Sequence, residues 1–298
     1  MTQRLDLRRV PAPALVLGAI LSVQFGAAVA AGLIRQLGPV VTVAIRLDAA
    51  ALILAVIARP SLRGRTAADW RAVALLAGSI VVMNVAFYNA IARIPLGIVT
   101  TIEFVGPLGL AAASSRRPRD LIAVVVELAG VVAVSGVLDT SLKGLDTLGL
   151  VFTAIASGGW VSYILATRSI GRRFRQVDGL VFAMIGAAAL VTPLGVAVGV
   201  SSGIDLQAWQ LAAGASVGLL SSVIPYSLEL VALRRIDTRV FGILLSLEPA
   251  VAVLAGFLVL AQALTGMEVG GMALVVVASV IVMADQKPEP AEEAAEIG

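Results

Sequence analysis

The stretch LLSLEPAVAVLAG, residues Leu244–Gly256, lies inside a longer apolar run, Val240–Leu260, in which Glu248 is the only charged residue. Pro249 follows that acid directly and cannot donate a backbone hydrogen bond. A run of about 20 mostly apolar residues has the length that an α-helix needs to cross a bilayer. The stretch therefore predicts a transmembrane helix whose middle carries a carboxylate beside a helix breaker.

The rest of the chain has the same apolar character. Of its 298 residues, 59% are hydrophobic and 14% are charged, whereas a soluble domain carries roughly 25% charged residues. Too little polar surface is left to cover a water-soluble globule, so the composition indicates an integral membrane protein. The N-terminal segment resembles a signal peptide, but further apolar spans follow throughout, which favours a retained first transmembrane helix.

Ten segments are predicted to span the membrane as helices. Strands are not expected, because an isolated strand leaves its backbone polar groups unsatisfied in lipid. The ten segments are Pro13–Ile34, Val40–Ala58, Trp70–Ala92, Leu96–Ser114, Leu121–Leu138, Leu148–Ser169, Val177–Val200, Gln207–Leu233, Val240–Leu260 and Gly266–Ala284. The predicted fold class is therefore all-α integral membrane, and the charged tail 285–298 is expected to be disordered.

Basic residues are concentrated on alternate loops. With the N-terminus placed in the cytoplasm, 18 of the 22 lysines and arginines fall in inner segments and three in outer loops, while Arg46 lies within a span. Such an asymmetry is the positive-inside signal of a membrane protein. It predicts that both termini are cytoplasmic, and it argues against nucleic-acid binding as the reason for the net charge of +3.

A weak internal repeat relates the two halves of the chain. A shift of 142 residues places Ala92–Ala111 on Arg234–Val253 without a gap. The identities are Arg93, Ile94 and Pro107 with Arg235, Ile236 and Pro249. Because five spans per half is an odd number, the halves must be inverted relative to each other, as in many secondary transporters. The predicted units are two inverted five-helix repeats, residues 13–138 and 148–284.

Two longer segments resemble a known family. PLGIVTTIEFVGPLGLAAASSRRPRD (Pro95–Asp120) and IPYSLELVALRRIDTRVFGILLSLEPAVAVLAG (Ile224–Gly256) closely resemble segments of the bacterial threonine and homoserine exporters. Those proteins belong to the EamA-type branch of the drug/metabolite transporter superfamily. The resemblance implies ten helices, two EamA-type repeats and proton-linked export of small amino acids through the bacterial inner membrane. One departure is Gln262, where such repeats often carry a glutamate, and the resemblance assigns no role to Asp48 or Glu127.

Glu103 and Glu248 are the acids nearest the middle of their spans. A charge at the bilayer centre costs about 2.5–3.5 kcal/mol, so both acids should face the interior of the bundle. Pro107 and Pro249 each free a backbone carbonyl one turn upstream, because proline has no amide hydrogen. Each acid then lies beside a predicted helix break, which suits binding of an ammonium group or a proton. The alternative is that both acids are protonated or paired with Arg46 and only hold helices together.

Polar residues on the eighth span are further candidates. Ser222, Tyr226 and Glu229 share one helical face by their spacing, and Pro225 should break this helix and free the carbonyl of Ser221. Glu229 lies near the predicted cytoplasmic end of its span. A substrate contact and an ion pair at the membrane edge are therefore equally good explanations for it.

Arg46 lies deep in the second span and needs a partner. Asp48 is two residues away and therefore points to a different face of the helix. A carboxylate on another helix, or on the substrate, is the more plausible partner. Asn84 and Tyr88 lie one turn apart, where an interhelical hydrogen bond is the default expectation. Together with the acids, they could line a substrate cavity.

The amino-acid composition excludes several kinds of chemistry. The chain has no histidine and no cysteine, so thiol chemistry and histidine relays are excluded, and no metal or cofactor is expected. It also carries no nucleotide-binding fingerprint, which favours secondary transport over ATP-driven transport. The predicted function is proton-coupled export of small amino acids, with Glu248 as the first choice of proton carrier and Glu103 as the second. Another solute on the same fold, a membrane enzyme and a non-transporting assembly partner are the alternatives.

Overall fold

The computed structural model describes residues 10–115, 118–139, 144–174, 177–260 and 265–283. Within these ranges the secondary structure is helical and contains no strand, which confirms the all-α class. Gln262 and the predicted tail 285–298 lie outside the described residues. The elements are α1 (Ala12–Ala58), α2 (Ala67–Ile91), α3 (Leu96–Ser114), α4 (Pro118–Val134), η2 (Val137–Asp139), α5 (Thr147–Arg173), α6 (Asp178–Ser201), α7 (Ala208–Gly218), η3 (Leu219–Val223), α8 (Ile224–Leu233), α9 (Thr238–Leu245), α10 (Leu247–Leu260) and α11 (Gly266–Met283).

Hydropathy marks most of these helices as membrane-spanning. In the described ranges, six helices are long and apolar enough to cross a bilayer: Val29–Ala58, Ala67–Ile91, Leu96–Ser114, Thr147–Arg173, Asp178–Ser201 and Ala208–Leu233. Shorter apolar helices cover Ala12–Ala27, Leu121–Val134 and Gly266–Ile281. The chain is therefore a multi-pass membrane protein, while the count of ten spans and the inversion of the halves stay predictions.

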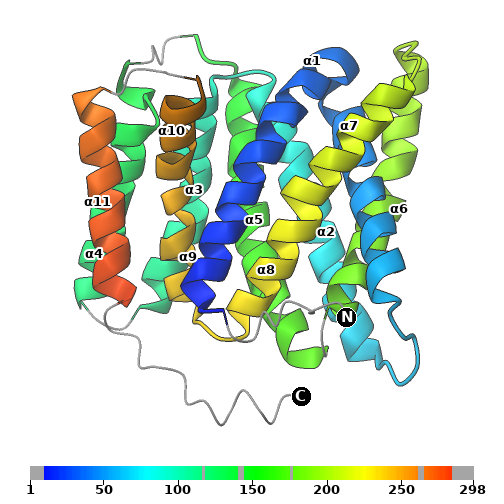
Figure 1. The fold of residues 1–298 in the computed structure, drawn as a ribbon, viewed down its shortest axis with the longest axis horizontal. Coiled ribbons are helices and arrows are strands. Elements are labelled where there is room, and N and C mark those ends of the chain that lie inside the picture. The colour runs from blue at the N-terminus through cyan, green and yellow to red at the C-terminus, as the bar shows by residue number, and fades with distance from the viewer. Residues whose placement is uncertain (1–9, 116–117, 140–143, 175–176, 261–264, 284–298) are drawn as a thin grey trace.

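The first two predicted spans are joined in one element, α1. Gly38 interrupts the helix with φ 73° and ψ 170°, a backbone conformation that residues with a Cβ rarely adopt. Pro39 follows and begins the second stretch. In Figure 1 the first part of α1 rises through the bundle, and the second part returns beside α6.

The helices stand side by side in one bundle (Figure 1). The main packing pairs are α2 with α5, α1 with α6, and α4 with α11, and α1 also contacts α7, η3 and α8. Large aliphatic side chains lie on the outside, including Ile57 and Val125 at 72% and 67% exposure. Such an apolar exterior would be an aggregation hazard in water and suits contact with lipid.

The three prolines predicted to break helices act in different ways. α3 continues through Pro107, because a hydroxyl from α5 satisfies the carbonyl that this proline frees. Before Pro225 the helix widens into the π-helical turn η3. The predicted span Val240–Leu260 is divided at Ser246 rather than at Pro249, which lies in the first turn of α10. A missing amide is tolerated there, since the first amides of a helix have no intrahelical acceptor.

Candidate functional site

A cavity of about 120 Å³ lies between helices from both halves of the chain. The charged residues on its wall are Glu103, Glu229, Glu248 and Arg46. The other lining residues are Val23, Met83, Asn84, Phe87, Trp160, Tyr163, Ser221 and Tyr226. The structure thus brings together six of the seven residues that the sequence analysis proposed for the substrate or proton pathway, and the seventh, Tyr88, contacts Arg46.

Arg46 is 7% exposed and is held by uncharged groups. Its Nε donates to Ser222 Oγ at 2.8 Å, and its Nη1 donates to Tyr88 OH at 3.1 Å. Its Nη2 donates to the carbonyl of Ser221 and lies 3.5 Å from Tyr226 OH. Among the described residues Arg46 forms no ion pair, so the predicted carboxylate partner on another helix is not present there. Its positive charge is therefore available to an anion in the cavity.

Pro225 explains why the carbonyl of Ser221 is free to accept from Arg46. In an uninterrupted α-helix this carbonyl would bond the amide of residue 225, which proline lacks. The carbonyl of the preceding residue, Leu220, accepts from Ser22 of α1 at 2.6 Å. At Pro225 and the π-helical turn before it, two backbone carbonyls therefore accept hydrogen bonds from side chains of α1.

Tyr226 and Tyr163 connect the surroundings of Arg46 to Glu229. Asn84 Nδ2 donates to Tyr226 OH at 3.0 Å, and the Tyr163 and Tyr226 rings lie 5.1 Å apart between centroids. Tyr163 OH donates to Glu229 Oε2 at 2.7 Å. Glu229 therefore lies in the cavity wall and contacts α5. The pairing of Tyr163 with Glu229 could not be predicted from the sequence, because the two residues are 66 positions apart and no local spacing reveals it.

Glu103 and Glu248 line the same cavity from α3 and α10. Ser157 Oγ of α5 donates to the backbone carbonyl of Glu103 at 3.0 Å, which is the acceptor that Pro107 frees. Among the described residues neither carboxylate accepts a hydrogen bond, so both retain their acceptor capacity. Carboxylates in this state are suited to bind a proton or an ammonium group.

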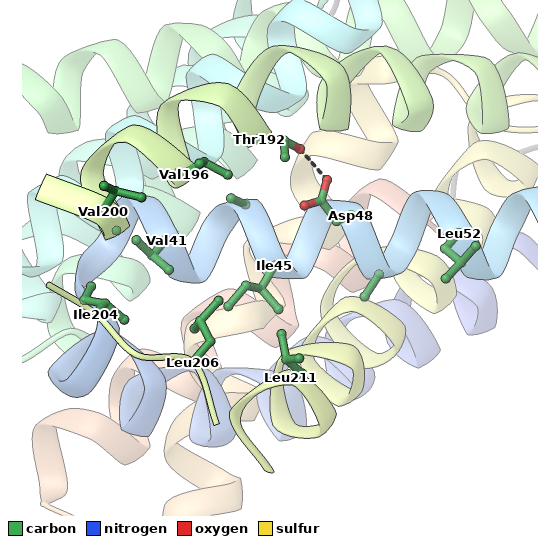
Figure 2. A pocket seen from close by; sticks show the side chains of 14 residues that line it. Val41, Ile45, Asp48, Leu52, Thr192, Val196, Val200, Ile204, Leu206 and Leu211 are labelled. Atoms are coloured by element: carbon green, nitrogen blue, oxygen red, sulfur yellow. Dashed lines mark hydrogen bonds between the residues drawn. The ribbon is translucent and has the colours of Figure 1, made fainter. Parts of the chain in front are cut away.

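A second, larger cavity of about 470 Å³ lies between α1, α6 and α7. Figure 2 shows that aliphatic side chains such as Val41, Ile45 and Leu211 surround it, with Asp48 at one side. Asp48 Oδ1 accepts from Thr192 Oγ1 at 2.6 Å. Asp48 thus lies on another face of α1 than Arg46, as the spacing predicts. No cation lies among the residues that line this cavity, so charges of both signs meet only in the smaller one.

Comparison with known proteins places the chain among transporters. Residues 147–284 match the EamA-like transporter family. The threonine/homoserine exporter RhtA of Salmonella typhimurium (strain LT2) is 36% identical over 263 residues, which cover 88% of this chain and 87% of that protein. The protein of the same name from Escherichia coli (strain K12) is 34% identical over 279 residues and 92% of each chain. A solved crystal structure with 19% identity superimposes with a TM-score of 0.73 over 92% of this chain and 96% of that one, which supports the fold.

Proposed function

Because this chain belongs to the EamA-like transporter family and is an exporter of the drug/metabolite type, we propose that it carries small amino acids such as threonine and homoserine out of the bacterial cytoplasm. We propose further that export is coupled to protons. The observation that carries the proposal is the cavity in which Arg46 faces Glu103, Glu229 and Glu248.

The charges of the cavity are complementary to an amino acid. A zwitterion brings one carboxylate and one ammonium group, and burying either without a partner costs several kcal/mol. Arg46 is the partner for the carboxylate, since its own hydrogen bonds go to neutral oxygens. Glu103 or Glu248 is the partner for the ammonium group. The hydroxyl of threonine or homoserine would find Asn84 or Tyr226 on the same wall.

The size of the cavity supports a small solute. Pockets for drug-sized ligands measure about 300–1,000 Å³, whereas this cavity measures about 120 Å³. The larger cavity beside Asp48 is in the drug-sized range, but no cation among its lining residues would neutralise an amino acid's carboxylate. A different solute on the same fold is the alternative, and it would need another binding place than the charged cavity.

The charges of the residues that line the cavity support proton coupling. Three carboxylates face one guanidinium group, and a zwitterionic substrate adds no net charge. Protons must therefore neutralise part of the wall, since uncompensated charge is costly inside a membrane. We assign the coupling proton to Glu248 and, as second choice, to Glu103. The chain has no histidine, so a carboxylate has to carry it.

We also propose the arrangement in the membrane. The 18-to-3 distribution of basic residues supports cytoplasmic termini in the inner membrane. The family match over residues 147–284 nearly coincides with the second proposed unit, 148–284, and supports its bounds. The inverted orientation of the two units rests on the odd number of spans in each half. Each repeat would contribute one of the mid-span acids, Glu103 or Glu248.

Transport into inverted membrane vesicles tests the proposal. Vesicles containing the protein should accumulate threonine and homoserine when a proton gradient is imposed, and collapse of the gradient should abolish the accumulation. A panel of large, acidic and basic amino acids identifies the range of solutes. Vesicles that accumulate none of these amino acids above the level of empty vesicles would contradict amino-acid export. Accumulation that is indifferent to the gradient would contradict proton coupling.

A further inference from the structure

A further membrane-embedded carboxylate lies outside both of these cavities. Glu127 of α4 is fully buried, at 0% exposure. Among the described residues, its hydrogen-bond partners are the hydroxyls of Ser246 and Ser279, the latter at 3.2 Å from Oε1. The other carboxyl oxygen, Oε2, is buried and has no partner there. Neither the sequence analysis nor the proposed transport mechanism uses this acid.

The hydrogen bonds around Glu127 can accommodate a proton on its carboxyl group. Ser246 Oγ contacts the carboxyl group and also lies 2.7 Å from the carbonyl of Ile243. A serine has one hydroxyl hydrogen, so it cannot donate to both acceptors at the same time. If Glu127 is protonated, the acid donates to Ser246 and Ser246 donates to Ile243. If Glu127 is ionised, a charge with an unpartnered oxygen is buried, which costs several kcal/mol.

Close packing of α4 against α11 separates the Glu127 carboxyl group from water. Gly130 lies one turn after Glu127 on α4 and faces Gly271 of α11. A Cβ added at Gly130 would lie 2.9 Å from the Gly271 carbonyl oxygen, and one at Gly271 would lie 2.8 Å from the Gly130 carbonyl oxygen. The two backbones are therefore in contact beside the acid. Separation of α4 and α11 would open this side of the acid to water.

Ser246 links the acid to the cavity. It is the single residue between the end of α9 at Leu245 and the start of α10 at Leu247. Glu248 follows two residues later in the first turn of α10. If Glu127 loses its proton, the Ser246 hydroxyl turns from the Ile243 carbonyl to the carboxylate. The hydrogen bonding at the break between α9 and α10, next to Glu248, then changes. Glu127 is thus placed to act on Glu248 through this break.

No other charged group contacts Glu127 in the described part of the chain. The titratable residues with described side chains on the elements packed against α4 are Glu103 on α3, Glu248 on α10 and Glu268 on α11. None of them is hydrogen-bonded to Glu127. Its proton is therefore governed by burial, by the two serines and by access of water.

We propose that Glu127, Ser246 and Ser279 form a second proton-binding site, which exchanges its proton when α4 and α11 separate and thereby positions Glu248. The role in coupling rests on the proposed function, because it presupposes proton-driven export. The existence of the proton site does not depend on it.

Infrared spectroscopy of the purified full-length protein tests the proton itself. At neutral pH, Glu127→Gln should remove one component from the absorption of protonated carboxyl groups. The control Glu268→Gln changes a half-buried acid at the start of α11, outside this site, and should leave the Glu127 component in place. Ser246→Ala keeps the acid but removes its hydroxyl partner, so the same component should shift in frequency. A spectrum of Glu127→Gln that keeps every wild-type component would overturn the site, whatever transport shows.

Proteoliposomes test the role of the site in coupling. With equal pH on both sides, Glu127→Gln should exchange labelled threonine for unlabelled threonine at close to the wild-type rate. Accumulation driven by a pH gradient should fall by about tenfold or more, and Glu127→Asp should restore part of it, because aspartate retains a titratable group. Full gradient-driven accumulation by Glu127→Gln would refute the coupling role. A wild type that ignores the gradient would contradict the proposed function instead, and the infrared result would still decide the proton site.

Discussion

At the scale of single residues, Arg46 combines a charge with an unusually neutral environment. A guanidinium group has five N–H donors in a fixed fork, and here the donors go to Ser222, Tyr88, Tyr226 and a backbone carbonyl. These contacts orient the group without cancelling its charge. A substrate carboxylate that enters the cavity would therefore meet a cation that is already positioned, which lowers the ordering cost of binding.

Replacing Arg46 with lysine should weaken substrate binding although the charge is kept. Lysine is a point charge on a flexible stem and cannot reproduce the fork that contacts Tyr88 and Ser222. We expect threonine affinity to fall by about 10–100-fold, the value of one hydrogen bond to a charged group. The fluorescence of Trp160, which lines the cavity, provides a binding titration. Arg35→Lys, at an exposed position on α1, is the control, and equal losses in both variants would argue against a specific role of Arg46.

Glu248→Gln should separate substrate exchange from proton coupling. Glutamine imitates the protonated acid in shape and neutrality, so the variant should still bind threonine and exchange it across the membrane. It cannot release a proton, so it should lose the response to an imposed pH gradient. Parallel counterflow and gradient-driven uptake in proteoliposomes measure the two activities. If the variant retains full gradient-driven accumulation, Glu248 is structural and Glu103 becomes the proton carrier to test.

At the scale of secondary-structure elements, proline supplies the cavity with backbone acceptors. Pro107 and Pro225 each remove one amide, and the carbonyls that they free accept from Ser157 and Arg46. Neither proline leaves an unsatisfied carbonyl, because a side chain of another helix takes the place of the missing amide. The interruptions therefore connect helices to one another, which is a use of broken helices typical of transporters.

Pro225→Ala should strengthen the helix and weaken the site. Alanine restores an amide that competes with Arg46 for the Ser221 carbonyl, so the π-helical turn η3 should relax towards α-helix. We expect an unchanged or higher thermal unfolding temperature, since proline within a helix is unfavourable, together with about tenfold weaker threonine binding. Pro193→Ala is the matched control, because Pro193 lies within α6 and is not among the residues that line the charged cavity. Unaltered binding in Pro225→Ala would show that Arg46 does not depend on the broken helix.

At the scale of the whole molecule, apolar side chains form the exterior of the bundle and charged side chains lie in its interior. Aliphatic side chains such as Ile57 and Val125 face outward, while Arg46, Glu103 and Glu229 are buried inside the bundle. The ionisable groups of the spans are thereby kept from lipid, where they would be most costly.

Cysteine labelling should establish the orientation of this bundle. The chain has no native cysteine, so a single introduced thiol gives an unambiguous signal. Ser202→Cys and Ser61→Cys lie at exposed positions after α6 and after α1. A membrane-impermeant maleimide added to intact cells should label the first from outside and reach the second only after permeabilisation. The opposite pattern would reverse the proposed topology, and with it the assignment of both termini to the cytoplasm.

Local properties of the chain were enough to predict the helical membrane fold and most polar residues of the cavity, and the resemblance of two segments to known exporters indicated the family. Hydropathy over 20 residues depends only on neighbours in sequence, and the cost of a charge in lipid forces Arg46, Glu103 and Glu248 to face inward wherever they lie. Proline acts locally too, so the freed carbonyls of Glu103 and Ser221 were foreseeable.

The partners of these groups required the packed helices. Hydroxyls and a carbonyl rather than a carboxylate hold Arg46, and Tyr163 pairs with Glu229. The predicted span Val240–Leu260 is divided at Ser246 instead of at Pro249. Each of these outcomes depends on how helices rotate and cross, because a side chain bonds whatever the neighbouring helix presents to it. Those neighbours lie up to 180 residues away, as in the contact of Arg46 with Tyr226. Sequence spacing therefore indicates which face of a helix is polar, whereas interhelical packing determines what that face meets.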